Sequence, residues 1–403
     1  MRPRLLVGAL AACALVSATP ALAATVNRPT YQTPEVTIET PYVVVHYTRT
    51  GPDHPRFMTD DDHDGVPNYV EKLAASANKA WLWYGHNGFK SPLPDTGGGS
   101  TKLDIYVKSL KPGVFGVSIP PAQGQGGGFM VLDNRLDMAH LASNGSLQQT
   151  TAHELFHMFQ FSYVPDGRLP VWAAEGSAVA MQTYVYPKIV DAAAFDYFDH
   201  WLDQPWRSLT DERAGCDHCY GGALFWRFLF GLGGHVVSEY FGRLYGFQKT
   251  AQAVGDGTQP LDEILQKRAH GSLYNAFTRF SYDIYRSGYR PLPFTKLTAS
   301  SVVQKTPVRV VRGLSTHYIP ISVPAAAKGI AVGVGANGGP NPEVKLVVGG
   351  PKGRVIEGIH RAQGHEQYFV TRFRNAKERQ NAMLIVTSGR DVGTAYLVAY
   401  QAI

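Results

Sequence analysis

The spacing of apolar residues predicts a buried helix near the middle of the chain. The segment begins near Ser146 and stops before Pro165, and Ser146 with Gln149 fits a capping box at its start. Four apolar residues fall on one face of this helix: Ala152, Leu155, Phe156 and Phe159. The same helix carries His153 and His157 away from that face, so its packing side and its histidine side are separate.

Similar patterns predict further helices and several strands around this segment. The spacing indicates helices over about 67–84 and 171–184, and three more in YGGALFWRFLF, HVVSEYFGRLYG and SLYNAFTRFSYDIY. Runs of β-branched and aromatic residues predict strands over 42–48, in TKLDIYVKSL and over 129–132. We therefore expect a mixed α+β domain with a small sheet and a helical second half.

The pattern changes near residue 290. The segment SGYRPLPF contains two prolines and is typical of a linker. From about residue 300, short β-rich runs alternate with Gly, Asn and Pro turns, which indicates an all-β sandwich of seven or eight strands. The expected organisation is a domain over 24–290, a linker over 291–300 and a sandwich over 301–403.

Composition and charge narrow the class of protein. Hydrophobic residues make up 44% of the 403 residues and charged residues 17%, which is typical of a globular chain and not of a disordered one. The formal charge of +6 is modest, and no dense run of Lys and Arg is present, so we expect no nucleic-acid binding. Beyond the N-terminus, no stretch is long and apolar enough to span a bilayer.

The N-terminus has the pattern of a secretory signal peptide. A basic MRPR is followed by the apolar run LLVGALAACALVSA and by small residues at Ala21 and Ala23. We expect residues 1–23 to be removed and the protein to be secreted. The alternative is a lipoprotein anchored through Cys13, but the apolar run continues past that residue.

After such cleavage, Cys216 and Cys219 are the cysteines that remain. In an oxidising compartment they are expected to form a local disulfide. A free or regulatory thiol pair is the alternative, and a zinc ribbon would need a second pair that the sequence lacks.

The histidine pair has the spacing of a metal site. Residues i and i+4 lie on the same helix face, so His153 and His157 can reach one ion, with Glu154 beside them. A catalytic zinc needs a third ligand. Glu175 lies on the next predicted helix after a short turn and is the only acidic residue between Pro170 and Lys188, so it is the candidate. The alternatives are two ordinary helix histidines and a partly exposed glutamate.

These motifs give the chain a resemblance to a known family. HELFHMFQ followed by WAAEGSA resembles the gluzincin zinc metallopeptidases, and more closely secreted bacterial metalloproteases that add an acidic DxDxDG loop and a β-rich tail. The resemblance implies a zincin-like fold for the first domain. It also implies that His153, His157 and Glu175 bind Zn²⁺, while Glu154 acts as general base on a zinc-activated water.

The resemblance leaves other roles less defined. Zincins place a substrate-pairing edge strand before the ligand helix, which corresponds here to Gly124–Leu132. Tyr220 is expected to steady the oxyanion, with His218 as the alternative. Thermolysin-like members carry an acidic residue four positions after the third ligand, but this chain has Val179 there, so other residues must orient the histidines.

The segment DDDHDGVPNYVE matches a calcium-loop template, with Gly65 at the sharp turn. The expected Ca²⁺ ligands at positions 1, 3, 5, 7, 9 and 12 are Asp60, Asp62, Asp64, Val66, Asn68 and Glu71. No helical pattern precedes the loop, so it is not a paired EF-hand, and the alternative is an acidic cap of the following helix.

The sequence therefore predicts a secreted zinc endopeptidase that acts on protein or peptide substrates and is stabilised by calcium. The C-terminal sandwich is expected to contact substrate, matrix or cell surface. One alternative is a catalytically silent zincin-like scaffold acting as an adhesion module. The other is a zinc hydrolase of a non-peptide substrate.

Overall fold

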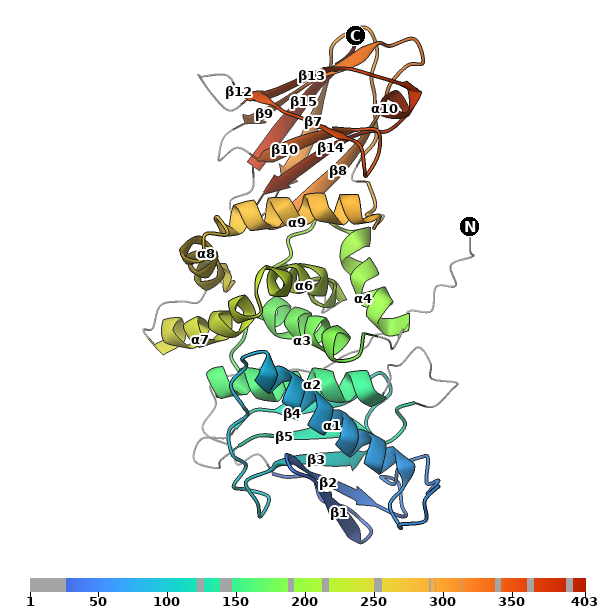
Figure 1. Cartoon of the computed structure of the whole chain (residues 1–403), viewed down its shortest axis with the longest axis vertical. Helices are drawn as coiled ribbons and strands as arrows, with labels where there is room; N and C mark the ends of the chain where they lie inside the picture. The colour runs from blue at the N-terminus through green and yellow to red at the C-terminus, as the bar shows by residue number, and fades with distance from the viewer. Residues whose placement is uncertain are drawn as a thin grey trace. The chain divides into compact units, whose positions relative to one another are not determined.

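The computed structural model (Figure 1) describes residues 27–121, 127–137, 147–187, 192–211, 217–249, 256–289, 291–293, 295–311, 313–337, 342–360, 366–388 and 394–403. The predicted signal peptide with Cys13, the helix cap Ser146 and Cys216 lie outside the described residues. The chain is mixed α+β with several sheets and helices, as the sequence predicts.

The chain divides into two compact units. The first comprises residues 1–198 and 214–260, and the second comprises residues 199–213 and 261–403. The second unit thus begins before the predicted linker at 291–300. The reason is helix α9 (Leu273–Ser287), whose hydroxyl groups bond to sandwich strands: Thr278 Oγ1 lies 3.0 Å from Thr387 Oγ1, and Ser281 Oγ lies 2.6 Å from Thr316 Oγ1.

The first unit contains one five-stranded mixed sheet. Its strands, in the order in which they pair, are β1 (Glu35–Glu39), β2 (Val43–Thr48), β3 (Leu103–Lys108), β5 (Phe129–Asp133) and β4 (Gly116–Ile119). Strands β2, β3 and β5 are parallel to one another, while β1 and β4 pair antiparallel at the two edges. The prediction that the strand at Gly124–Leu132 forms the edge of the sheet is therefore wrong. Strand β5 is internal because it pairs with β3 on one side and with β4 on the other, and β4 forms the edge.

Helices α1 and α2 cover one face of this sheet (Figure 1). The helices of the first unit are α1 (Asn68–His86), α2 (Leu147–Tyr163), α3 (Val171–Val185), α5 (Asp217–Gly221), α6 (Ala223–Leu232) and α7 (His235–Lys249). Two more, α4 (Ala192–Asp203) and α8 (Thr258–Lys267), cross the boundary between the units. Among the described residues, no helix has the length and apolarity needed to cross a membrane.

The other face of the sheet carries a buried ion-pair network. The guanidinium of Arg28 binds the carboxylates of Asp95 and Asp104, which are 1% and 0% exposed. Burial of two carboxylates is costly unless they are paired. Arg28 therefore ties the first described residues of the chain to the sheet.

The second unit is a sandwich of two five-stranded sheets. One has the order β11 (Arg354–Ile356), β10 (Glu343–Val348), β14 (Ala382–Ser388), β8 (Ser315–Ser322) and β6 (Leu297–Thr298). The other has the order β12 (Ile359–His360), β13 (Glu366–Arg372), β9 (Gly329–Asn337), β15 (Thr394–Ala402) and β7 (Gln304–Val311). Strands of both sheets share one hydrophobic core. The described residues thus hold ten sandwich strands where the sequence predicts seven or eight, because β6, β11 and β12 are only two or three residues long.

Candidate metal centre

Helix α2 is buried on nearly all sides. Its apolar stripe packs against α1, where the Tyr84 ring lies 5.1 Å from Phe156 and from Phe159, centroid to centroid. The hydroxyl of Tyr84 also donates to the carbonyl of Ala152. These contacts fix the rotation of α2 so that His153 and His157 face α3. Helix α3 is apolar, and most of its residues are buried. Gly176 allows α3 to pack closely against α6, because a Cβ at this position would lie 2.9 Å from the Trp226 side chain.

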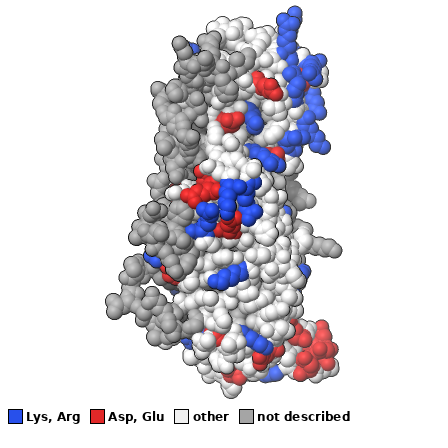
Figure 2. All heavy atoms as spheres, turned by 60° about the vertical axis from the view of Figure 1, so that its left-hand side comes forward, with Lys and Arg blue, Asp and Glu red and all other residues white. Residues whose placement is uncertain are grey.

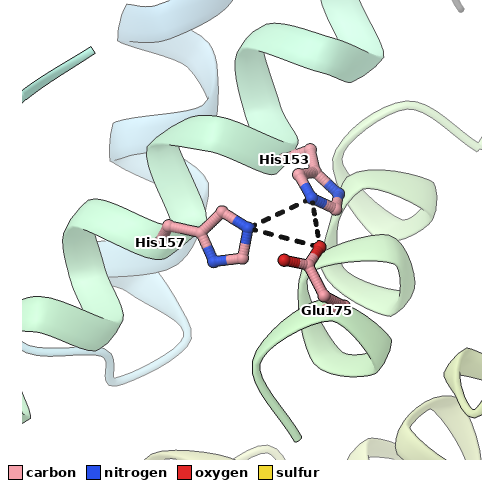
Figure 3. A group of neighbouring side chains, drawn as sticks. All are labelled: His153, His157 and Glu175. Atoms are coloured by element: carbon pink, nitrogen blue, oxygen red, sulfur yellow. Dashed lines mark hydrogen bonds and ion pairs between the residues drawn. The ribbon is translucent and has the colours of Figure 1, made fainter. Parts of the chain in front are cut away.

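Three predicted ligands meet between α2 and α3 (Figure 3). The Nε2 atoms of His153 and His157 are 3.1 Å apart, and Glu175 Oε2 lies 3.1 Å from the first and 3.6 Å from the second. Ligands 2.0–2.1 Å from a tetrahedral zinc are about 3.3 Å from one another. The triangle therefore has the size that a zinc ion requires, and its three atoms point toward a common position.

Two glutamines orient the histidines. Gln160 Oε1 lies 2.8 Å from His157 Nδ1, and Gln182 Oε1 lies 2.9 Å from His153 Nδ1. The Gln160 amide nitrogen donates to the carbonyl of Ala174 at 3.0 Å, so its oxygen must face His157. A carbonyl oxygen can only accept, so Nδ1 of His157 carries the proton and Nε2 is directed at Glu175. Gln160 and Gln182 thus orient the two histidines, a role that the apolar side chain of Val179 cannot take.

The triad is a buried charge cluster. His153, His157 and Glu175 are 5%, 2% and 0% exposed, and Glu175 Oε1 has no hydrogen-bond partner among the described residues. Burial lowers the pKa of His157, but the Glu175 carboxylate outweighs this and raises it to about 9. Burial raises the pKa of Glu175, but His157 and His153 lower it to about 2. Such a site has the donor set and the negative charge to hold a divalent cation.

Glu154 is held next to the triad by the edge strand β4. The hydroxyl of Ser118 donates to Glu154 Oε2 at 2.8 Å. Gly116 gives the carboxylate room, because a Cβ there would lie 2.5 Å from Glu154 Cγ. The charge of Glu154 also contributes to the raised pKa of His157, so the carboxylate is close to the metal-binding face. The structure thus brings the predicted base and the predicted ligands together.

Helix α5 places the candidate oxyanion residue beside the triad. The Tyr220 ring lies 6.3 Å from the His153 ring, centroid to centroid, and is 1% exposed. His218, the alternative, is on the same helix and is 3% exposed. Cys219 between them is a free, buried thiol, and Cys216, its predicted disulfide partner, lies outside the described residues. Cys219 is 1% exposed in the interior of the unit, away from an oxidising solvent.

The acidic loop brings its first three predicted ligands together. Carboxylate oxygens of Asp60, Asp62 and Asp64 lie within 4.8 Å of one another. Two backbone amides tighten the loop: Gly65 N donates to Asp60 Oδ2 at 2.9 Å, and Val66 N donates to Asp64 Oδ1 at 2.7 Å. Gly65 has a φ of 87°, which favours glycine at this turn.

Of the remaining three predicted ligands, Val66 lies in the loop just before α1, and Asn68 and Glu71 lie on α1. The side-chain oxygen of Asn68 accepts the amide of Asp61 at 3.1 Å. Desolvation and the charges of Asp62 and Asp64 raise the pKa of Glu71, so its carboxylate lies near the others. Hard oxygen donors are therefore gathered around one turn.

The sequence did not assign a role to Gln160, Gln182, Gly116 or Ser118. Gln160 is the last residue of the HExxHxxQ pattern, and its place three residues after His157 could have indicated a contact with that histidine. The roles of the other three depend on packing between elements and have no signal in the spacing.

The chain was compared with models of protein families and with curated proteins. No family model and no curated protein matches it.

Proposed function

We propose that the first unit is a zinc-dependent endopeptidase of the gluzincin type. The observation that carries the proposal is the triangle of His153 Nε2, His157 Nε2 and Glu175 Oε2, with distances of 3.1, 3.1 and 3.6 Å. The neighbouring carboxylate of Glu154 adds the base that hydrolysis requires. An antiparallel edge strand next to the ligand helix, as in zincins, supports the same assignment.

The residues of the site have defined tasks in this reaction. His153, His157 and Glu175 would hold the zinc, which when bound polarises a substrate carbonyl and acidifies a water molecule. Glu154 accepts the proton of the attacking water and returns it to the leaving amine, so no covalent intermediate with the protein is needed. Strand β4 offers its free edge to an extended peptide, since its other edge pairs with β5.

The test compares wild type with Glu154→Gln. Both proteins are expected to bind one equivalent of zinc, and wild type alone should cleave an unfolded substrate such as reduced casein. Asp166→Asn, in an exposed loop, is a matched control that should keep full activity. Absence of bound zinc, or equal cleavage by Glu154→Gln, would sink the proposal. Zinc binding without peptide cleavage would favour the silent scaffold or a hydrolase of another substrate.

We also propose that the acidic loop binds calcium and that the chain is secreted. Calcium is supported by the gathered oxygens of Asp60, Asp62 and Asp64, and secretion by the sequence of residues 1–23. Calcium should raise the thermal unfolding midpoint of wild type and not that of the double variant Asp62→Asn and Asp64→Asn. An equal effect of calcium on both proteins would contradict this site. Secretion is tested by comparing the cells with their culture medium: the chain in the medium should lack residues 1–23.

A further inference from the structure

The positive charge of the chain is concentrated in its C-terminal quarter. Residues 301–403 contain 13 Lys and Arg against 5 Asp and Glu, a net charge of +8, whereas residues 1–300 contain 25 against 27, a net charge of −2. The two values add up to the +6 of the whole chain. The sandwich is therefore a basic module on an otherwise weakly acidic protein.

Within the second unit, basic residues gather where three segments meet. These segments are the turn between β10 and β11, the end of β13, and α10 (Ala376–Gln380). Gly349 N donates to Asn381 O at 3.0 Å, which joins the turn to the end of α10. Arg354 Nη2 donates to Arg372 O at 3.0 Å, which joins β11 to the end of β13.

We call the cluster of basic side chains at this junction the basic rim. Its members are Lys352, Arg372, Arg374, Lys377 and Arg379. All but Arg379 are exposed, and Arg379 is partly exposed. Figure 2 shows Lys and Arg side chains gathered along one edge of the upper part of the molecule, where the sandwich strands lie.

Among the described residues, none of the five rim side chains forms an ion pair with an acidic side chain. Glu378 is the only acidic residue in the segments 349–356 and 372–381. Glu378 is 8% exposed, and its carboxylate binds the guanidinium of Arg354 at 2.9 Å, beneath the rim. Glu378 also interacts with the charge of Arg374, but one carboxylate shared with Arg354 leaves the five rim residues with a clear surplus of positive charge. Such repulsion is unfavourable within the free protein and is relieved by an anionic partner.

The side chains at the rim discriminate between classes of anionic partner. Three of the five are arginines, whose planar guanidinium groups bind sulfate or phosphate oxygens in a bidentate manner. The large exposed apolar residues in this part of the described chain are Val355 and Val370, and no exposed aromatic side chain accompanies them. A membrane surface usually engages Trp, Phe or Leu, and single-stranded nucleic acid engages stacked aromatic rings.

We propose that the basic rim is a docking surface for an anionic polysaccharide with sulfate or phosphate groups along its chain. The rim would hold the second unit on such a polymer through arginine contacts. This inference does not depend on the proposed peptidase function.

The test measures binding of the full chain to heparin, a sulfated polysaccharide, by surface plasmon resonance. The rim variant is Arg372→Glu, Arg374→Glu and Lys377→Glu. The matched control reverses three exposed charges of the first unit, Arg56→Glu, Lys111→Glu and Arg168→Glu, and so changes the net charge equally. Circular dichroism and thermal unfolding check that both variants fold.

The expected result is that the rim variant binds heparin about a hundredfold more weakly, since each of the three basic residues near an anionic surface contributes about fivefold. The control should lose less than about twofold, and wild-type binding should weaken with salt. Equal losses in the two variants, or no binding by wild type, would overturn the proposal. Tighter rim-dependent binding to anionic phospholipid vesicles or to duplex DNA than to heparin would also overturn it.

Discussion

Zinc binding to the triad should release a proton at neutral pH, because His157 is protonated in the metal-free protein. Burial lowers the pKa of His157, and the Glu175 carboxylate raises it further than burial lowers it, to about 9. An imidazolium has no lone pair for a metal, so zinc must displace that proton. At pH 7 this deprotonation costs about 3 kcal/mol, or roughly a hundredfold in affinity.

The assay is competition with a chromophoric chelator of known proton affinity between pH 6.5 and 9.5. Zinc affinity should rise about tenfold per pH unit from pH 7 to 9 and then level off. Calorimetry in two buffers with different ionisation enthalpies should count at least one proton released per zinc at pH 7. A zinc affinity that is constant from pH 7 to 9, with no proton released, would refute the reasoning.

The shifted pKa values of His157 and Glu175 also make the stability of the metal-free protein depend on pH. The folded pKa of His157, about 9, lies above its ordinary 6.5, so its stabilising contribution is complete below pH 6.5 and is lost as the pH rises through 9. The folded pKa of Glu175, about 2, lies below its ordinary 4.5, so its contribution is complete above pH 4.5 and is lost as the pH falls through 2. With chelator present, the contribution of this pair to the free energy of unfolding should be greatest between about pH 4.5 and 6.5.

Three further substitutions test the parts of the first unit. Gln182→Leu removes the acceptor that orients His153 and should weaken zinc binding about 10–100-fold in the chelator assay. Gly116→Ala should displace Glu154 and lower casein cleavage by about 10²-fold or more, with zinc content unchanged. Arg28→Ala leaves buried Asp95 without its cation and Asp104 with His46 alone, and should lower the free energy of unfolding by about 3–5 kcal/mol in urea denaturation. A loss below about 1 kcal/mol would show that solvent replaces the guanidinium.

The ligand helix could be predicted from sequence because its chemistry is local. Two histidines four residues apart must share a helix face, and the apolar stripe at Leu155, Phe156 and Phe159 fixes which face is buried. Glu175 was predictable for a similar reason, since a lone carboxylate in an apolar helix needs a partner. These inferences need only the helical period and the cost of burying charge.

The elements that the sequence did not reveal depend on contacts between distant segments. Strand β4 is only four residues long, and its buried positions are Gly116 and Ser118 while Val117 and Ile119 are partly exposed. Its hydrophobic pattern therefore does not indicate the buried face, and it is a strand because it pairs with β5. The predicted boundary near residue 290 differs from the structure because α9 packs on β14, about a hundred residues later. The apolar stripe of α9 was visible in the sequence, but the packing of α9 against β14 was not.

The neutral glutamines beside the histidines explain how the triad can exist in two states. In the metal-free protein, the proton of His157 compensates the charge of Glu175, so the buried pair is close to neutral. When a divalent cation replaces that proton, the same carboxylate compensates the metal instead. A carboxylate at the position of Gln160 or Gln182 would add a second buried negative charge, which the metal-free protein would have to neutralise with a further proton. Neutral acceptors fix both imidazoles and keep the cost of burial low in either state, which is why an amide suits these two positions in a site enclosed by α2 and α3.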